Sequence, residues 1–224
     1  MGRQLQANDR QLRRRTTKQA RRAPYARILT VTEGSKTEPL YLEEICAAHR
    51  LNSANVEVHP ARRGTAPIQV VRYAQQLFSD GDPHKGIRPR SFDRVYAVFD
   101  RDEHESYFNA LSLAGSLDGK LRNDDQQPVQ FKAVASVPSF ELWLLLHYED
   151  VKHPISRDLV MHKLRRYLPG YEKGAGGAFA ATRGRLDAAV HRAQALAVRF
   201  SAYTAPEPFT GVHELVQMLL KLRS

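Results

Sequence analysis

The sequence lacks the features of a secreted, membrane-spanning or zinc-binding protein. Its single cysteine, Cys46, excludes an internal disulfide. No apolar run approaches the roughly 20 residues of a membrane-spanning helix, and the arginine-rich N-terminal segment has no apolar stretch of the kind found in secretory signals. His104 has no second histidine or cysteine at zinc-ligand spacing. We therefore expect a cytoplasmic protein with no membrane segment.

Positive charge is abundant, and it is concentrated at one end of the chain. The formal net charge is +10, and residues 1–27 contain nine Lys or Arg against one acid, which accounts for eight of those ten charges. So few apolar residues cannot offset the entropy of ordering the segment. We predict that residues 1–26 form a basic arm that binds nucleic-acid phosphates through Arg13, Arg14 and Arg15. A solvated extension that only aids solubility is the alternative.

Short apolar segments alternate with helical patterns along the first two thirds of the chain. The predicted strands are residues 28–32, 56–59, 94–99 and 129–135. The predicted helices are residues 40–48, 68–78, 107–113 and 140–147. Strands joined by helices favour right-handed crossovers and a mostly parallel sheet with helices on both faces.

The last third of the sequence is predicted to be helical. We expect an α/β core over residues 27–150, with a helical extension over 151–224 packed on it. Its helices are predicted near residues 156–168, 179–202 and 212–222. The glycines of residues 170–177 indicate a flexible loop between the first two of these helices. Thr37 is a predicted helix N-cap, and Ser139 could either cap the following helix or orient Glu141.

Acidic residues follow two of the predicted strands. Glu33 comes directly after the first strand, and Asp100 and Asp102 follow the third. Ligands of parallel α/β sheets bind at the carboxyl ends of the strands, and residues two apart in an extended chain point the same way. Carboxylate oxygens are the ligands that Mg²⁺ prefers. The three acids therefore predict a metal site, although each acid alone could serve a turn or a helix N-terminus.

Three longer motifs carry a family resemblance. They are Thr32-Glu33-Gly34-Ser35-Lys36-Thr37-Glu38-Pro39-Leu40-Tyr41, Asp100-Arg101-Asp102-Glu103-His104, and Pro138-Ser139-Phe140-Glu141-Leu142-Trp143-Leu144-Leu145-Leu146-His147. An acid and glycine after one strand and an Asp-x-Asp after another resemble the Toprim domain of topoisomerases, primases and several nucleases. The added acid and the Ser-x-Glu triplet resemble the overcoming-lysogenization-defect nucleases. All three motifs together resemble the RloB family from about residue 27 onward.

The resemblance implies an activity and assigns roles to residues. It implies a Toprim-like fold, metal-dependent phosphodiester cleavage and a link to restriction and phage-defence loci. Glu33 would be a general base or metal ligand, Asp100 and Asp102 metal ligands, and Glu38 and Glu141 would help to hold a second ion. The cofactor would be Mg²⁺, with Mn²⁺ able to substitute. Two such ions stabilise both the attacking and the leaving oxygen.

Basic residues near these motifs are further candidates. Lys36 is positioned to touch a scissile phosphate, with a solvated loop lysine as the alternative. His147 is a candidate catalytic donor, although a satisfied core histidine is the favoured interpretation. Arg62 and Arg63 follow the second strand, so we predict that they contact phosphates at the same edge.

The leading hypothesis is a metal-dependent nuclease that acts on RNA, such as tRNA, or on DNA, in phage defence. Nucleotidyl transfer is less favoured because the sequence has no glycine-rich phosphate loop. A non-catalytic nucleic-acid-binding subunit of a restriction or defence complex is the alternative function. Self-association and partner proteins of a defence system both stay open.

Overall fold

The protein is built around one five-stranded sheet. The computed structural model describes residues 26–52, 55–61, 66–101 and 105–222. The strand order is β2-β1-β3-β4-β5. The strands are β1 (Ile28–Thr32), β2 (Val56–Pro60), β3 (Arg94–Asp100), β4 (Gln130–Val137) and β5 (Phe209–Thr210). The first four strands are parallel, and only β5 runs antiparallel to its neighbour β4.

The register brings the carboxyl ends of the parallel strands to one edge. Thr32 of β1 pairs with Val98 of β3, and Asp100 of β3 pairs with Ser136 of β4. All five residues of β1 are buried, which matches a central strand covered on both faces. The side chains that follow these strands therefore meet at the same end of the sheet.

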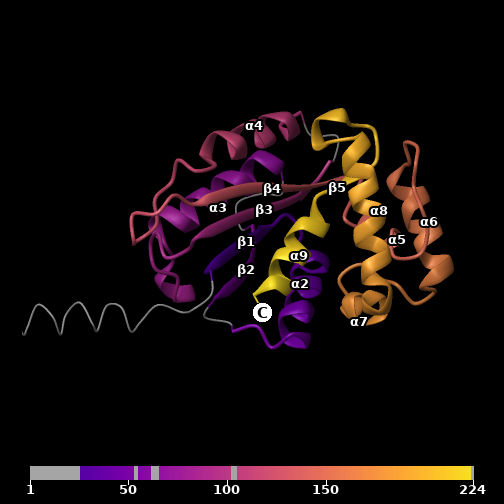
Figure 1. Ribbon diagram of the computed structural model, residues 1–224, viewed down its shortest axis with the longest axis horizontal. Coiled ribbons are helices and arrows are strands. Elements are labelled where there is room, and N and C mark those ends of the chain that lie inside the picture. Colours follow the sequence, from indigo (N-terminus) through magenta and orange to yellow (C-terminus); the bar gives the residue numbers. More distant parts are fainter. Residues whose placement is uncertain (1–25, 53–54, 62–65, 102–104, 223–224) are drawn as a thin grey trace, which may run out of the picture.

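Helices cover both faces of the sheet, as Figure 1 shows. Successive strand residues point to opposite faces, so Tyr96 and Val98 join one core while Ala97 and Phe99 join the other. The first core is completed by α2 (Thr37–Ala48) and α9 (Val212–Lys221). The second is completed by α3 (Pro67–Asp80) and α4 (Tyr107–Leu117).

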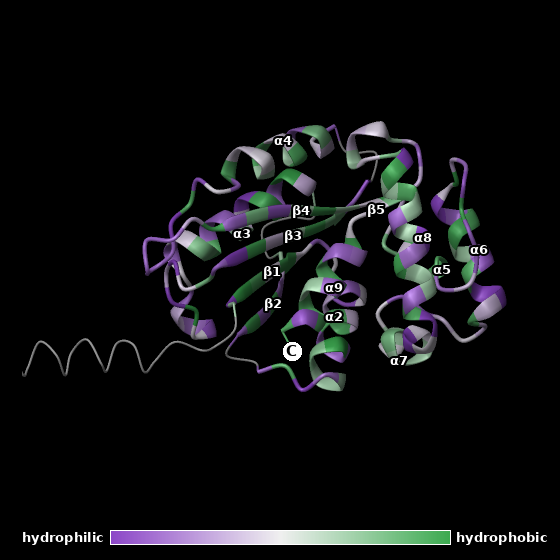
Figure 2. Cartoon of the chain, viewed as in Figure 1, coloured by the Kyte–Doolittle hydropathy of each residue, from purple (hydrophilic) through white to green (hydrophobic). Residues whose placement is uncertain are grey.

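The remaining helices gather beyond the carboxyl end of the sheet, near β5 (Figure 1). They are α5 (Glu141–Leu145), α6 (Arg157–Tyr167), α7 (Ala178–Thr182) and α8 (Leu186–Arg199). Short 3₁₀ turns lie at η1 (Pro83–Lys85), η2 (Arg183–Arg185) and η3 (Ala202–Thr204). All five residues of α5 are buried, and Figure 2 shows apolar and hydrophilic residues alternating along α6 and α8. In α5, the Trp143 indole donates to the Tyr41 hydroxyl at 2.8 Å and ties this group to α2.

The predicted α/β class is confirmed, as a mostly parallel sheet flanked by helices. The prediction of about four strands missed β5, whose two residues come from the C-terminal segment. Thr37 was wrongly predicted as an N-cap, since it is the first residue of α2 and follows Lys36. Ser139 does not cap α5 either, because its hydroxyl donates to a carboxylate instead. No helix within the described ranges is long and apolar enough to cross a membrane.

Candidate functional site

A cavity of about 370 Å³ lies at the carboxyl edge of the sheet. Four carboxylates line it, and each comes from a different segment. Glu33 follows β1, Glu38 lies in the first turn of α2, Asp100 ends β3 and Glu141 begins α5. The fold therefore brings together acids that are up to about a hundred residues apart in the sequence.

Glu33 is fixed to β3 by two hydrogen bonds. Its amide donates to the Val98 carbonyl at 2.8 Å, and its Oε2 accepts from the Asp100 amide at 2.9 Å. The next residue, Gly34, leaves room for a second carboxylate. A Cβ on Gly34 would lie 2.0 Å from Oε2 of Glu38, so any larger residue would force the Glu38 carboxylate to move. The Glu-Gly pair thus lets a second carboxylate approach the first.

Burial and mutual repulsion disfavour the charged forms of two of these acids. Burial raises the pKa of Asp100 well above its ordinary value, and the charges of Glu38, Glu141 and Glu33 raise it further. Burial also raises the pKa of Glu38, with a further contribution from Glu141. The cavity therefore favours an additional cation or proton.

Two basic side chains partly meet this demand. An Arg157 guanidinium nitrogen lies 3.2 Å from an Asp100 oxygen, and the Lys173 ammonium lies 2.9 Å from Oε1 of Glu141. Their side chains are 38% and 47% exposed, so both can also meet a ligand that enters the cavity. The site thus combines buried carboxylates with cations at its mouth.

Glu141 is the most buried of the four carboxylates, with 1% of its surface exposed. The Ser139 hydroxyl donates to its Oε2 at 2.7 Å, and the Tyr171 hydroxyl donates to its Oε1 at 3.3 Å. Burial and the neighbouring carboxylate raise the pKa of Tyr171, so this hydroxyl keeps its proton and remains a donor. These contacts fix the Glu141 carboxylate while Lys173 approaches from solvent.

The donor chemistry of the cavity suits Mg²⁺, because all four carboxylates offer oxygen ligands. In the part of the chain that the structure describes, however, no three or more His, Cys, Asp or Glu are arranged to hold a metal ion. Arg157 and Lys173 contact Asp100 and Glu141 instead. A bound ion would need those two pairs to open.

The structure brings together most of the candidate site residues that it describes. Glu33, Lys36, Glu38, Asp100 and Glu141 all line the cavity. The other candidates, Asp102, Arg13, Arg14, Arg15, Arg62 and Arg63, lie outside the described residues.

His147 is not among the residues that line the cavity. It is fully buried, its Nδ1 contacts the Trp143 carbonyl at 3.0 Å, and burial lowers its pKa to about 4. These observations favour its interpretation as a core histidine.

Two residues that contribute to the site, Arg157 and Tyr171, carry no signal in the sequence. Arg157 is the first residue of α6, and nothing in its local sequence links it to an aspartate 57 positions earlier. Tyr171 belongs to the glycine-rich loop, and nothing in the local sequence links its hydroxyl to Glu141, which lies 30 positions earlier. That loop packs on the site, because a Cβ at Gly174, whose φ is +74°, would lie 2.7 Å from the Lys36 Cβ.

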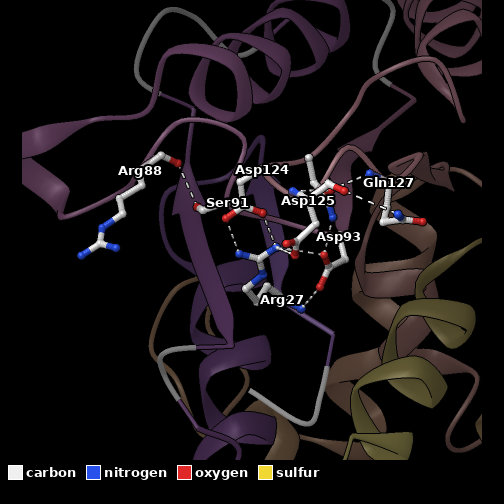
Figure 3. Close-up of polar contacts among 8 residues, drawn as sticks. Arg27, Arg88, Ser91, Asp93, Asp124, Asp125 and Gln127 are labelled. Atoms are coloured by element: carbon white, nitrogen blue, oxygen red, sulfur yellow. Dashed lines mark hydrogen bonds and ion pairs between the residues drawn. The ribbon is translucent and has the colours of Figure 1, made fainter. Parts of the chain in front are cut away.

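A second acidic cluster lies at the opposite, amino edge of the sheet, and Figure 3 shows it around Arg27. The Arg27 guanidinium contacts Asp124 at 2.7 and 2.9 Å and Asp93 at 3.1 Å. Burial alone would raise the pKa of Asp93, but hydrogen bonds and charge from Arg27 outweigh it and lower the pKa. The pKa of Asp124 is lowered chiefly by its hydrogen bonds with Arg27. This cluster already has its counterion.

The comparison with known proteins places the chain in a family. No curated protein and no solved structure matches the sequence significantly. The family model described as RloB-like protein matches residues 28–219, a range that holds the whole sheet and the four carboxylates of the cavity. The chain therefore belongs to the RloB-like protein family.

Proposed function

We propose that the protein is a Mg²⁺-dependent nuclease that cleaves a phosphodiester bond in the cavity at the carboxyl edge of the sheet. The observation that carries this proposal is the convergence of Glu33, Glu38, Asp100 and Glu141 on one cavity. Acidic groups that raise one another's pKa in a cavity are typical of functional sites. A bound cation would neutralise the negative charge of these carboxylates.

The described residues would divide the work between the metal and the phosphate. Glu33, Glu38, Asp100 and Glu141 would supply oxygen ligands, and a bound Mg²⁺ would polarise the phosphate and lower the pKa of a water molecule. Arg157 and Lys173 would leave their carboxylate partners and pair with phosphate oxygens. Lys36, exposed at the rim of the cavity, would contact the same group.

The finer aspects of the proposal rest on the motifs. The Glu-Gly after β1 and the Asp-Arg-Asp that begins at the end of β3 support a Toprim-type site, and Asp102 would complete it. A role in phage defence, with nucleic acid as the target, is what the resemblance of the motifs implies, and the cytoplasm is the expected location. RNA, including tRNA, and DNA are both candidate substrates.

Incubation with nucleic acid tests the proposal. The full chain is mixed with labelled tRNA or plasmid DNA in Mg²⁺, Mn²⁺ or EDTA. We expect cleavage of one substrate with either metal and none in EDTA. Binding without cleavage under every condition would instead support the alternative, a non-catalytic nucleic-acid-binding subunit.

A further inference from the structure

Two exposed aromatic rings lie at the same edge of the sheet as the cavity. Phe108 of α4 and Tyr203 of η3 are 41% and 56% exposed. Their ring centroids are 6.4 Å apart and their planes differ by only 21°. Aromatic pairs contact at about 4.5 to 7 Å, so these rings are at the long end of that range and keep much of their faces open to solvent.

Arg101 lies against Phe108 and against the neighbouring ring of Tyr107. Its guanidinium carbon is 5.4 Å from the Phe108 centroid and 5.6 Å from that of Tyr107. Its Nε is buried and has no hydrogen-bond partner. Arg101, Phe108 and Tyr203 are called the stacking cluster below.

Buried contacts hold the stacking cluster in place. The buried Tyr107 hydroxyl donates to the Ala202 carbonyl at 3.0 Å, which fixes η3 against the start of α4. The Arg101 amide donates to the Ser136 carbonyl of β4 at 2.8 Å. The segments that carry the exposed rings are therefore held by buried hydrogen bonds.

The stacking cluster and the cavity lie on either side of one peptide unit. Asp100 and Arg101 are successive residues at the end of β3, and successive residues of an extended chain point to opposite faces. Asp100 points into the cavity and pairs with Arg157, while Arg101 points to the rings of α4. A nucleic-acid strand that placed a phosphate in the cavity would carry a neighbouring base toward the rings.

We propose that the stacking cluster binds an unpaired base of a single-stranded RNA or DNA segment beside the cleaved bond. The identity of that bond rests on the proposed function, whereas the binding does not. Aromatic faces and arginine together are the usual means of holding unpaired bases, because every base has a face that stacks. A base paired within a duplex has its faces covered by neighbouring pairs and cannot use such a site.

A second ring pair on the protein provides a matched comparison. Tyr148 and Tyr167 stack at 4.9 Å with an angle of 9°, and Arg185 lies 5.2 Å from the Tyr148 ring. Tyr167 is 43% exposed, but its hydroxyl donates to Glu149 at 3.0 Å. That carboxylate also pairs with Lys163 at 2.6 Å, so this ring is held in a closed polar network, and each ring already covers the other. Tyr167→Ala is therefore a control for loss of an exposed stacked ring.

Binding is measured in EDTA, so that cleavage plays no part. Fluorescein-labelled single strands of about a dozen nucleotides, as RNA and as DNA, and a duplex of equal length are titrated with the full chain. We expect Phe108→Ala and Tyr203→Ala each to weaken single-strand binding about tenfold, with little change for the duplex. Phe108→Tyr, Tyr203→Phe and Tyr167→Ala should bind like the parent protein.

A fluorescence readout reports stacking directly. The only tryptophan, Trp143, is fully buried, so Tyr203→Trp adds a single exposed indole. A single strand should quench this indole and the duplex should not. The stacking cluster is excluded as a base-binding site if the indole is not quenched or if Phe108→Ala and Tyr203→Ala keep parental affinity. It is also excluded if Tyr167→Ala weakens binding as much as those two variants do.

Repeating the titrations in Mg²⁺ separates the two proposals. If binding depends on the stacking cluster but no cleavage occurs, the base-binding proposal stands and the nuclease proposal is excluded. If Phe108→Ala and Tyr203→Ala bind and cut single strands as the parent protein does, the stacking cluster is excluded as a base-binding site and the nuclease proposal stands.

Discussion

The two edges of the sheet each collect acidic residues, but they treat them in opposite ways. At the amino edge, Arg27 contacts Asp93 and Asp124 and lowers the pKa of both. At the carboxyl edge, burial and neighbouring carboxylates raise the pKa of Asp100 and Glu38. The first arrangement stabilises the fold, and the second stores unfavourable charge. A protein retains unfavourable charge most often where a ligand will neutralise it.

The largest expected difference between the two acidic clusters is in the cleavage rate of variants that lose one carboxylate. Asp100→Asn removes a carboxylate from the cavity but keeps its shape, whereas Asp93→Asn makes the same change at the amino edge. We expect the first variant to lose on the order of 100-fold in cleavage rate, as expected for loss of electrostatic stabilisation in a catalytic site. The second should cleave at the parental rate. Equal rates for both would remove Asp100 from the catalytic site.

The same pair of variants should change stability in opposite directions. At neutral pH, Asp93→Asn breaks part of the Arg27 cluster and should cost about 1 kcal/mol, after allowance for the partial exposure of the pair. Asp100→Asn removes a buried and repelled charge and should raise the free energy of unfolding, as urea titration would show. Destabilisation by both variants would mean that Arg157 outweighs the burial of Asp100.

The pH dependence of these differences follows from the direction of each pKa shift. The folded-state pKa of Asp100 is raised, so its charge costs nothing at a pH below the unfolded pKa and costs most above the folded pKa. The stability advantage of Asp100→Asn should therefore grow as pH rises. The folded-state pKa of Asp93 is lowered, so the deficit of Asp93→Asn should vanish as pH falls through that value. Urea titrations across pH measure both trends.

Loss of a single arginine should have the smallest effect at the carboxyl edge. Arg157→Gln removes one ion pair whose arginine is 38% exposed, so stability should fall by less than about 1 kcal/mol. Arg27→Gln removes the counterion shared by Asp93 and Asp124 and should destabilise the protein more. Thermal unfolding of the two variants compares them. A larger loss for Arg157→Gln would show that the carboxyl edge is held together as firmly as the amino edge.

Much of the fold could be predicted from local sequence patterns. β1 and β3 are short runs of buried, mostly β-branched and aromatic residues, and this local signal does not depend on distant segments. The two residues of β5 carry no such signal, because their pairing with Ser136 and Val137 depends on where α8 delivers the chain. Whether these two residues form a strand is therefore decided by the tertiary structure and not by the local sequence.

The candidate site divides in the same way. Glu33 and Asp100 could be predicted because strand ends share an edge, and Glu38 and Glu141 were found through family resemblance. Arg157 could not be found, since its role depends on how α6 lies against β3. For Ser139 the sequence left two roles open, a helix N-cap or a partner of Glu141, and only the structure shows that its hydroxyl donates to Glu141.

Manganese binding tests the contrast between the edges most directly. The full-length parent protein, Asp100→Asn and Asp93→Asn are titrated with Mn²⁺ while free Mn²⁺ is followed by electron paramagnetic resonance. We predict that the parent and Asp93→Asn bind Mn²⁺ alike and that Asp100→Asn loses at least tenfold in affinity. Absence of bound Mn²⁺ in the parent protein, or equal affinity in all three, would contradict the assignment of the carboxyl edge as a metal-dependent site.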